Sequence, residues 1–131
     1  MSKSIQKILL DSNCAIEVIA KQPLAESFVA ATEVYFPIIA VGELLYGAYN
    51  SGRREENTKR VREFVRSVRV LYCNDDTADW YARVRLQLKA IGKPIPMNDM
   101  WIAAIALQYG LPVASKDGHF DYVEGIERIE W

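Results

Sequence analysis

The sequence predicts an α/β domain with a five-stranded, mostly parallel sheet flanked by helices. Three observations lead to this prediction. The chain has 131 residues, half of them apolar and a quarter charged, which suits one folded domain over residues 1–131. Short apolar runs alternate along the chain with segments of helical period, as in α/β proteins. No linker, repeat or low-complexity stretch interrupts this alternation.

Five short apolar runs are the expected strands. They span residues 8–10, 34–36, 70–72, 112–114 and 126–130. They are short and apolar enough for parallel strands that are buried on both faces. The last run alternates polar and apolar side chains from Ile126 to Glu130, so we expect it at an edge of the sheet.

Helix signals fill the intervals between these runs. Ser12 is expected to cap the first helix and Pro23 stands near the start of the second, while Asn50 and Gly52 close the third. Two longer helices are expected over residues 55–68 and 77–91, and the second of them is opened by Asp75, Asp76 or Thr77.

The last helix is expected over residues 99–109, with Asn98 as its cap and Gly110 at its end. Its side chains from Met100 to Leu107 are apolar nearly all round, which indicates a helix buried on more than one side. This helix and its neighbours offer more hydrophobic surface than a small sheet needs. That surplus favours a homodimer.

Charge is distributed unevenly along the chain. The formal net charge of −1 gives the molecule no overall basic excess for binding nucleic acid. Residues 52–93, however, carry 11 basic and 6 acidic side chains. Part of this excess is explained by a solvated helix face with i,i+4 ion pairs. The remainder predicts contacts with RNA phosphates or with an acidic partner, and the candidates are Arg53, Arg54, Lys59 and Arg60.

Several classes of protein are excluded by composition. Two cysteines without a CxxC motif, together with a single histidine, make a structural zinc site improbable on sequence grounds. The longest apolar runs are shorter than the ~18–20 residues of a membrane span. The start of the chain has too few apolar residues for a secretory signal. We therefore expect a cytoplasmic protein without membrane contact.

Four carboxylates follow or flank the predicted strands. Asp11 comes directly after the first strand, and Glu43 lies in the helix after the second. Asp99 opens the helix before the fourth strand, and Asp117 comes three residues after that strand. Ligands of open parallel sheets bind beyond the carboxyl ends of the strands. We therefore expect the four side chains to meet at one rim.

Clustered carboxylates need a cation, because neighbouring like charges raise one another's pKa. Oxygen donors with few histidines and no paired thiols favour Mg²⁺, for which Mn²⁺ can substitute. Magnesium ions commonly bind substrate phosphates as well as protein carboxylates. Phosphodiester hydrolysis by activated water is the reaction that suits such a site.

Four motifs carry a resemblance to a known family. They are LLDSN at 9–13, VGELLYGA at 41–48, PMNDMWIAAIAL at 96–107 and SKDGHF at 115–120. In this order and spacing the chain resembles a PIN domain of the VapC toxin type over nearly its whole length. The resemblance implies a five-stranded parallel sheet and a ribonuclease dependent on Mg²⁺ or Mn²⁺. It also implies a homodimer and an antitoxin partner that restrains the enzyme.

The resemblance also implies roles for individual residues. Asp11, Glu43, Asp99 and Asp117 match the family's acidic residues, which hold the metal and carry catalysis. Asn13 and Ser115 would hydrogen-bond the carboxylates or the water at the site, which orients such ligands.

Other interpretations remain open. Taken singly, Asp11 is explained as a helix cap, Asp99 by the helix dipole and Asp117 by a turn. His119 is left outside the catalytic set, because an isolated histidine is more often packed or exposed at a turn. A haloacid-dehalogenase-type phosphatase needs an acid at position 13, where this chain has Asn13. A PIN-fold nuclease with a non-toxin role in RNA processing, and an RNA- or protein-binding module without catalysis, remain as alternatives.

Overall fold

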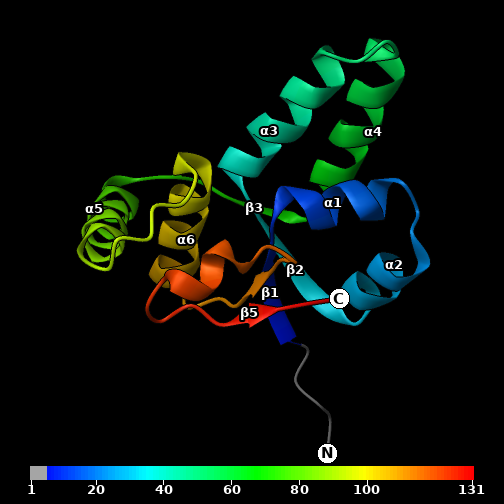
Figure 1. Ribbon diagram of the computed structural model, residues 1–131. Helices are drawn as coiled ribbons and strands as arrows, with labels where there is room; N and C mark the ends of the chain where they lie inside the picture. Colours follow the sequence, from blue (N-terminus) through cyan, green and yellow to red (C-terminus); the bar gives the residue numbers. More distant parts are fainter. Residues whose placement is uncertain (1–5) are drawn as a thin grey trace, which may run out of the picture.

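The strands of the computed structural model, which describes residues 6–131, form one parallel sheet (Figure 1). Their bounds are β1 Gln6–Leu10, β2 Thr32–Pro37, β3 Arg69–Leu71, β4 Val113–Ala114 and β5 Arg128–Ile129. They lie in the order β3-β2-β1-β4-β5, and each neighbouring pair is parallel. The predicted fold class and the edge position of the last strand are confirmed. Strand β5 is shorter than predicted because β4 offers only two residues for pairing.

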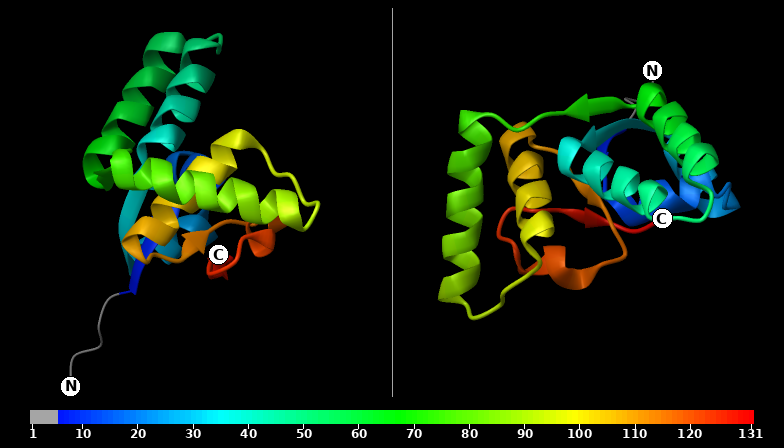
Figure 2. Two further views of the ribbon diagram at one scale, coloured as in Figure 1. Left: turned by 90° about the vertical axis from the view of Figure 1, so that its left-hand side faces the viewer. Right: turned by 90° about the horizontal axis from the view of Figure 1, so that it is seen from above.

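Helices surround this sheet on several sides. Their bounds are α1 Ser12–Ile19, α2 Pro23–Ala30, α3 Ile38–Tyr49, α4 Arg54–Ser67, α5 Asp75–Ala90, α6 Met97–Tyr109 and the 3₁₀ helix η1 Gly118–Tyr122. In Figure 1 the α3–α4 hairpin extends above the sheet, with α5 and α6 to the left and α1 and α2 to the right. Helices α5 and α6 pack side by side, as the right-hand view of Figure 2 shows.

Three of the predicted helix caps are wrong, those of α1, α5 and α6. Helix α1 is capped by Asp11 and not by Ser12, because Asp11 has the extended backbone of a cap and its Oδ1 accepts a hydrogen bond from the Cys14 N–H. Helix α5 is capped by Asn74, before the three candidates that the sequence suggested. The Asn74 side chain accepts from the Thr77 N–H and the Thr77 hydroxyl accepts from the Asn74 N–H, which is a capping box.

Helix α6 also begins earlier than predicted. It starts at Met97 after Pro96, and Asn98 lies inside its first turn, so the predicted Asn98 cap is wrong. No side chain among the described residues caps this end of α6. Its predicted end is confirmed, with Gly110 at a φ of 66°, in the left-handed region that glycine tolerates. Residues 102–106 are all buried, as the all-round apolar pattern predicts.

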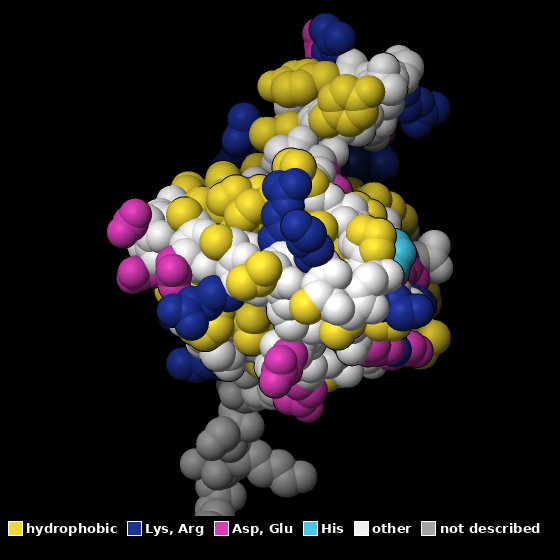
Figure 3. Space-filling view, turned by 60° about the vertical axis from the view of Figure 1, so that its left-hand side comes forward, with side chains coloured by type: hydrophobic (Ala, Val, Ile, Leu, Met, Phe, Trp, Pro, Cys, Tyr) yellow, Lys and Arg dark blue, Asp and Glu magenta, His cyan; other side chains and the backbone are white. Residues whose placement is uncertain are grey.

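The α3–α4 hairpin exposes aromatic surface. Tyr46 is 70% exposed and Tyr49 is 47% exposed, both on α3. Figure 3 shows hydrophobic side chains gathered on the surface of this projecting hairpin. Within residues 6–131 none of the helices has both the length and the apolar character that a bilayer crossing requires.

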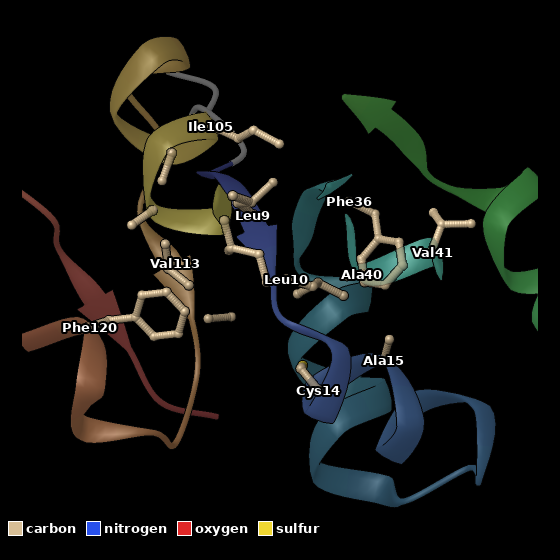
Figure 4. Packing of buried hydrophobic residues seen from close by; sticks show 14 of the residues in the cluster. Leu9, Leu10, Cys14, Ala15, Phe36, Ala40, Val41, Ile105, Val113 and Phe120 are labelled. Carbon is tan, nitrogen blue, oxygen red and sulfur yellow. The ribbon is translucent and has the colours of Figure 1, made fainter. Parts of the chain in front are cut away.

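The core lies around β1 and β4, and it fixes the two strand ends at which polar residues begin. Figure 4 shows Val113 and Phe120 on one side of β1, and Phe36 and Ala40 on the other. In the parallel register Leu10 pairs with Ala114. The residues that follow, Asp11 and Ser115, therefore leave the sheet side by side at its carboxyl edge.

Candidate metal centre

A pocket of about 460 Å³ opens at the carboxyl edge of the sheet, and all four predicted carboxylates line it. Asp11 follows β1, and Glu43 projects from α3. Asp99 lies in the first turn of α6, and Asp117 caps η1 after β4. The topology thus brings together four side chains that are up to 106 positions apart in the sequence.

Asp11 is the most deeply buried of the four, with 5% of its surface exposed. Its Oδ1 accepts from the Cys14 N–H at 2.8 Å, and its Oδ2 accepts from the Ser115 hydroxyl at 2.6 Å. The same hydroxyl oxygen accepts from the Asp117 N–H at 2.9 Å. Ser115 therefore links two carboxylate residues of the pocket. Asp11 also caps α1, so the same side chain is both a helix cap and a carboxylate of the pocket.

Glu43 has a carboxylate oxygen that is available to bind a cation or a hydrogen-bond donor. Its Oε1 is buried, yet it has no hydrogen-bond partner within residues 6–131. Burial raises the pKa of Glu43 most, the nearby Asn98 and Ser12 side chains lower it, and the charges of Asp99 and Asp11 raise it. A buried, unpartnered carboxylate oxygen is unfavourable unless a cation or a donor satisfies it.

His119 belongs to the cluster although the sequence analysis left it out. The Asp117 Oδ1 accepts from the His119 backbone N–H at 2.9 Å, which turns the chain back on itself. The His119 Nδ1 then lies 3.0 Å from the Asp117 Oδ2 and 3.4 Å from the Asp99 Oδ2. The signal in the sequence was the Asp-Gly-His order, because a turn at Gly118 returns residue i+2 to residue i.

The electrostatics of the pocket favour a bound cation. Burial, opposed by hydrogen bonds from Ser115 and Cys14 and aided by neighbouring charges, raises the pKa of Asp11. Burial also raises the pKa of Asp99, which His119 lowers and the charge of Asp117 raises. Burial raises the pKa of the Cys14 thiol to about 12, so it is not a thiolate ligand. Oxygen donors with the free Glu43 Oε1 among them fit a hard divalent ion.

The raised carboxyl pKa values predict how the stability of the metal-free protein depends on pH. A carboxyl whose pKa is higher in the folded state than in the unfolded state binds its proton more tightly in the folded state. Its contribution to the free energy of unfolding is therefore full below the unfolded pKa of ~4 and is lost as pH rises through the folded pKa. Glu43→Gln removes the titrating carboxyl, so the variant does not lose this stability as pH rises. We expect the stability gain of Glu43→Gln over wild type, measured by urea unfolding in EDTA, to grow from pH 4 to pH 7.5. A gain that stays constant across this range would contradict a raised pKa of Glu43 in the folded state.

One arginine fixes the loop that carries Asp117 and His119. The Arg128 guanidinium donates to the Ser115 carbonyl at 3.1 Å and to both carboxylate oxygens of Asp121 at 2.8 and 2.9 Å. These hydrogen bonds hold the pKa of Asp121 below its usual range. Ser115 and Asp121 are the first and last residues of the segment 115–121, which carries Asp117 and His119. Arg128 therefore holds both ends of this segment in place.

The remaining predicted residues are scattered. Asn13 is exposed at the pocket, and it makes no hydrogen bond to a carboxylate in the described part of the chain. Arg53 and Arg54 stand at the end of the α3–α4 hairpin remote from the sheet (Figure 1). Lys59 and Arg60 lie further along α4, and Arg60 lines a second groove that it shares with Glu43. Of the four predicted basic contacts, only Arg60 thus lines a groove with one of the site carboxylates.

Comparison with known proteins places the chain in a family. The profile of the PIN domain matches residues 8–126. Ribonuclease VapC2 of Haemophilus influenzae is 30% identical over 95% of this chain and 98% of its own length. A tRNA(fMet)-specific endonuclease VapC of Salmonella typhimurium is 30% identical over the same shares of the two chains. The structure of a DNA-bound VapBC from Salmonella typhimurium superposes with a TM-score of 0.88 at 29% identity, covering 98% of this chain and 99% of that one. The chain therefore belongs to the PIN domain family, and within that family to the VapC group.

Proposed function

We propose that this chain is the toxin endoribonuclease of a toxin–antitoxin pair, and that it hydrolyses RNA phosphodiesters with Mg²⁺, for which Mn²⁺ can substitute. The observation that carries the proposal is the pocket in which four carboxylates meet, one of them with a buried and unpartnered oxygen. The names of the relatives, which include a ribonuclease and a tRNA-specific endonuclease, support RNA as the substrate. VapBC proteins form a family of toxin–antitoxin systems, which supports the toxin role.

Individual residues of the pocket would have separate roles in binding the ion and the substrate. Asp11, Glu43, Asp99 and Asp117 would hold the ion, and a divalent cation supplies a Lewis acid that neutralises phosphate charge and activates water. The Ser115 hydroxyl keeps Asp11 in position and so orients one ligand. The Glu43 Oε1, which has no hydrogen-bond partner within residues 6–131, would be one of the oxygens that bind the ion. Asn13 at the pocket mouth is exposed and can donate to a phosphate oxygen.

The proposed test is cleavage of RNA by the purified protein with Mg²⁺ or Mn²⁺, and again with EDTA. We expect cleavage only with the metal. The products should carry 5′-phosphate and 3′-hydroxyl ends, because attack by the 2′-hydroxyl usually needs a pair of histidines and the chain has one. Undiminished cleavage in EDTA, or 2′,3′-cyclic phosphate as the main product, would contradict the mechanism.

The same cleavage assay, together with expression of the protein in growing cells, separates the alternatives. A binding module without catalysis would retain RNA and leave it intact at every metal concentration. A nuclease with a role in RNA processing would cut RNA without arresting growth when it is expressed alone. A toxin should arrest growth, and expression of its antitoxin should restore it.

Arg60 is the basic residue best placed to contact an RNA phosphate. It lines the groove that also contains Glu43. Its guanidinium lies 2.8 Å from the Glu56 Oε1, and both side chains of this ion pair are exposed on α4. Exposed ion pairs of this kind contribute little, so the guanidinium can turn to a phosphate at small cost. We expect Arg60→Gln to raise KM for RNA about tenfold, ~1.4 kcal/mol, with kcat little changed. Arg83→Gln, which breaks an exposed pair with Asp79, is the control and should leave KM unchanged. Equal effects in the two variants would argue against a specific contact.

The groove beside the site is also where we place the antitoxin. It has a volume of about 470 Å³ and lies between α1, α3 and α4. Its apolar lining includes Ile16, Leu44 and Val61, and it shares Ser12 and Glu43 with the carboxylate pocket. An antitoxin segment that fills this groove would therefore also cover the approach to the metal ligands.

The homodimer remains part of the proposal. Two aromatic side chains of α3, Tyr46 and Tyr49, are exposed, and Figure 3 shows hydrophobic side chains gathered on the α3–α4 hairpin. Clustered apolar surface of this kind is typical of an interface between subunits. Sedimentation of the purified chain measures its oligomeric state directly, and a monomer at all concentrations would overturn this part of the proposal.

A further inference from the structure

One side chain of the pocket has a chemistry that the four carboxylates do not explain. His119 is the single histidine of the chain, and its ring stands against two of the proposed ligands. Its Nδ1 is inaccessible to solvent, although 42% of the side-chain surface is exposed. The ring therefore turns its Nδ1 edge into the cluster and another part of its surface to water.

The contacts of this nitrogen are close but are not hydrogen bonds. The His119 Nδ1 lies 3.0 Å from Asp117 and 3.4 Å from Asp99, yet within residues 6–131 it has no partner with hydrogen-bond alignment. An N–H that was donated to either carboxylate would align with it. A lone pair that binds an ion shared with the two oxygens need not align with either of them.

The spacing of the three donors suits a shared ion. One oxygen each of Asp99 and Asp117 and one ring nitrogen of His119 all lie within 4.8 Å of one another. Adjacent ligands of an octahedral ion with bonds of about 2.1 Å stand about 3.0 Å apart, because that separation is the bond length multiplied by √2. The two measured contacts of Nδ1 are close to this value.

We propose that His119 is a nitrogen ligand of the cation held by Asp99 and Asp117, and that it shifts the preference of the site from Mg²⁺ toward Mn²⁺. The proposal rests on the metal site of the proposed function and specifies one of its ligands. Carboxylates and water suit Mg²⁺ and Mn²⁺ alike, whereas an imidazole adds affinity for a transition metal such as Mn²⁺ and little for magnesium. Loss of His119 should therefore weaken Mn²⁺ binding selectively.

The test is pulsed electron paramagnetic resonance of Mn²⁺ bound to untagged protein, without RNA. We expect a nitrogen hyperfine coupling that changes when the protein is grown with ¹⁵N-labelled histidine. Because the chain has one histidine, this isotope effect can come only from His119. The measurement uses the wild-type protein, so it does not depend on the folding of a variant.

Metal affinities of a variant give the second measurement. We expect His119→Gln to bind Mn²⁺ about tenfold or more weakly, with Mg²⁺ affinity changed less than about twofold. Glu124→Gln, an exposed substitution just beyond η1, is the control and should change neither affinity. If His119 is instead an imidazolium that neutralises the two carboxylates in place of a metal, His119→Gln should bind both ions more tightly. That result, or a spectrum without the isotope effect, would overturn the proposal.

These outcomes are independent of the nuclease assay. Protein that cuts RNA but shows no histidine coupling would overturn the role of His119 and leave the nuclease proposal in place. Protein that shows the coupling but cuts no RNA would do the reverse. Protein that binds neither ion would overturn both.

Discussion

Replacing Asp99 with asparagine is expected to stop RNA cleavage and to raise the melting temperature of the metal-free protein. Opposing effects act on the Asp99 charge. Burial and the charge of Asp117 oppose the charge, while His119 favours it and the N-terminus of α6 favours it by ~0.3–1 kcal/mol. The net rise in the pKa of Asp99 shows that the opposing effects are larger, so a neutral side chain should stabilise the metal-free fold.

The expected sizes make the experiment decisive. Loss of a charged group from the reacting centre should lower kcat by about 10²–10³-fold. A stabilisation of ~1 kcal/mol should raise the melting temperature in EDTA by about 2–5 °C. Adding Mg²⁺ or Mn²⁺ should stabilise wild type much more than Asp99→Asn, because the metal binds the native state of the variant weakly.

A matched control comes from another helix. Asp76 lies in the first turn of α5 and is exposed, so Asp76→Asn removes a charge from a helix N-terminus away from the pocket. We expect Asp76→Asn to melt slightly lower and to cut RNA normally. If Asp99→Asn behaves in the same way and keeps the metal-induced shift of wild type, Asp99 is only a helix-start residue.

Asp11→Ala is expected to abolish cleavage and to destabilise the fold as well. The substitution removes the cap of α1, which contributes about 1 kcal/mol. It also leaves the buried Ser115 hydroxyl without its acceptor, at a cost of about 1–3 kcal/mol. Relief of the buried charge offsets a part of this. We expect urea unfolding to give a net loss of about 1–3 kcal/mol.

Asp11→Asn separates the two roles of this residue. The asparagine carbonyl can still accept from the Cys14 N–H, and the amide can donate to the Ser115 oxygen. Asp11→Asn should therefore lose less stability than Asp11→Ala, because it keeps the helix cap although the Ser115 hydroxyl loses its acceptor, while cleavage is lost to the same extent as in Asp11→Ala. Cleavage that survives in Asp11→Asn would remove Asp11 from the metal site and leave it a cap.

Much of the fold could be predicted from the sequence because its signals are local. A strand buried on both faces must be apolar, and a helix such as α6 that is enclosed by the core must be apolar all round, so both patterns are visible in short windows. The gathering of Asp11 and Asp117 followed from one further rule, that polar residues after parallel strands share an edge. Glu43 and Asp99 lie in α3 and α6, helices that connect strands of the same sheet. These four positions needed the order of the elements and not their exact packing.

Helix caps were less predictable because they depend on the backbone angles of one residue. Asp11, Ser12 and Asn13 are all good caps by type, and the sequence favoured Ser12. The pairing of Leu10 with Ala114 leaves Asp11 as the first residue beyond β1, in extended backbone, and so gives it the cap. The choice between chemically equal neighbours was made by the sheet register.

The sequence by itself determined the α/β class, the strands, the apolar helix and the four carboxylates. Only the tertiary structure decided that Ser115 links Asp11 to Asp117, that Arg128 holds the loop that carries Asp117 and His119, and that His119 joins the cluster. The physical reason is that periodicity is imposed by the burial of neighbouring residues, whereas these contacts depend on the register of β1 with β4 and on a single turn of η1. The contacts of Ser115 with Asp11 and of His119 with Asp99 join residues far apart in the chain, and no short window of the sequence contains both partners.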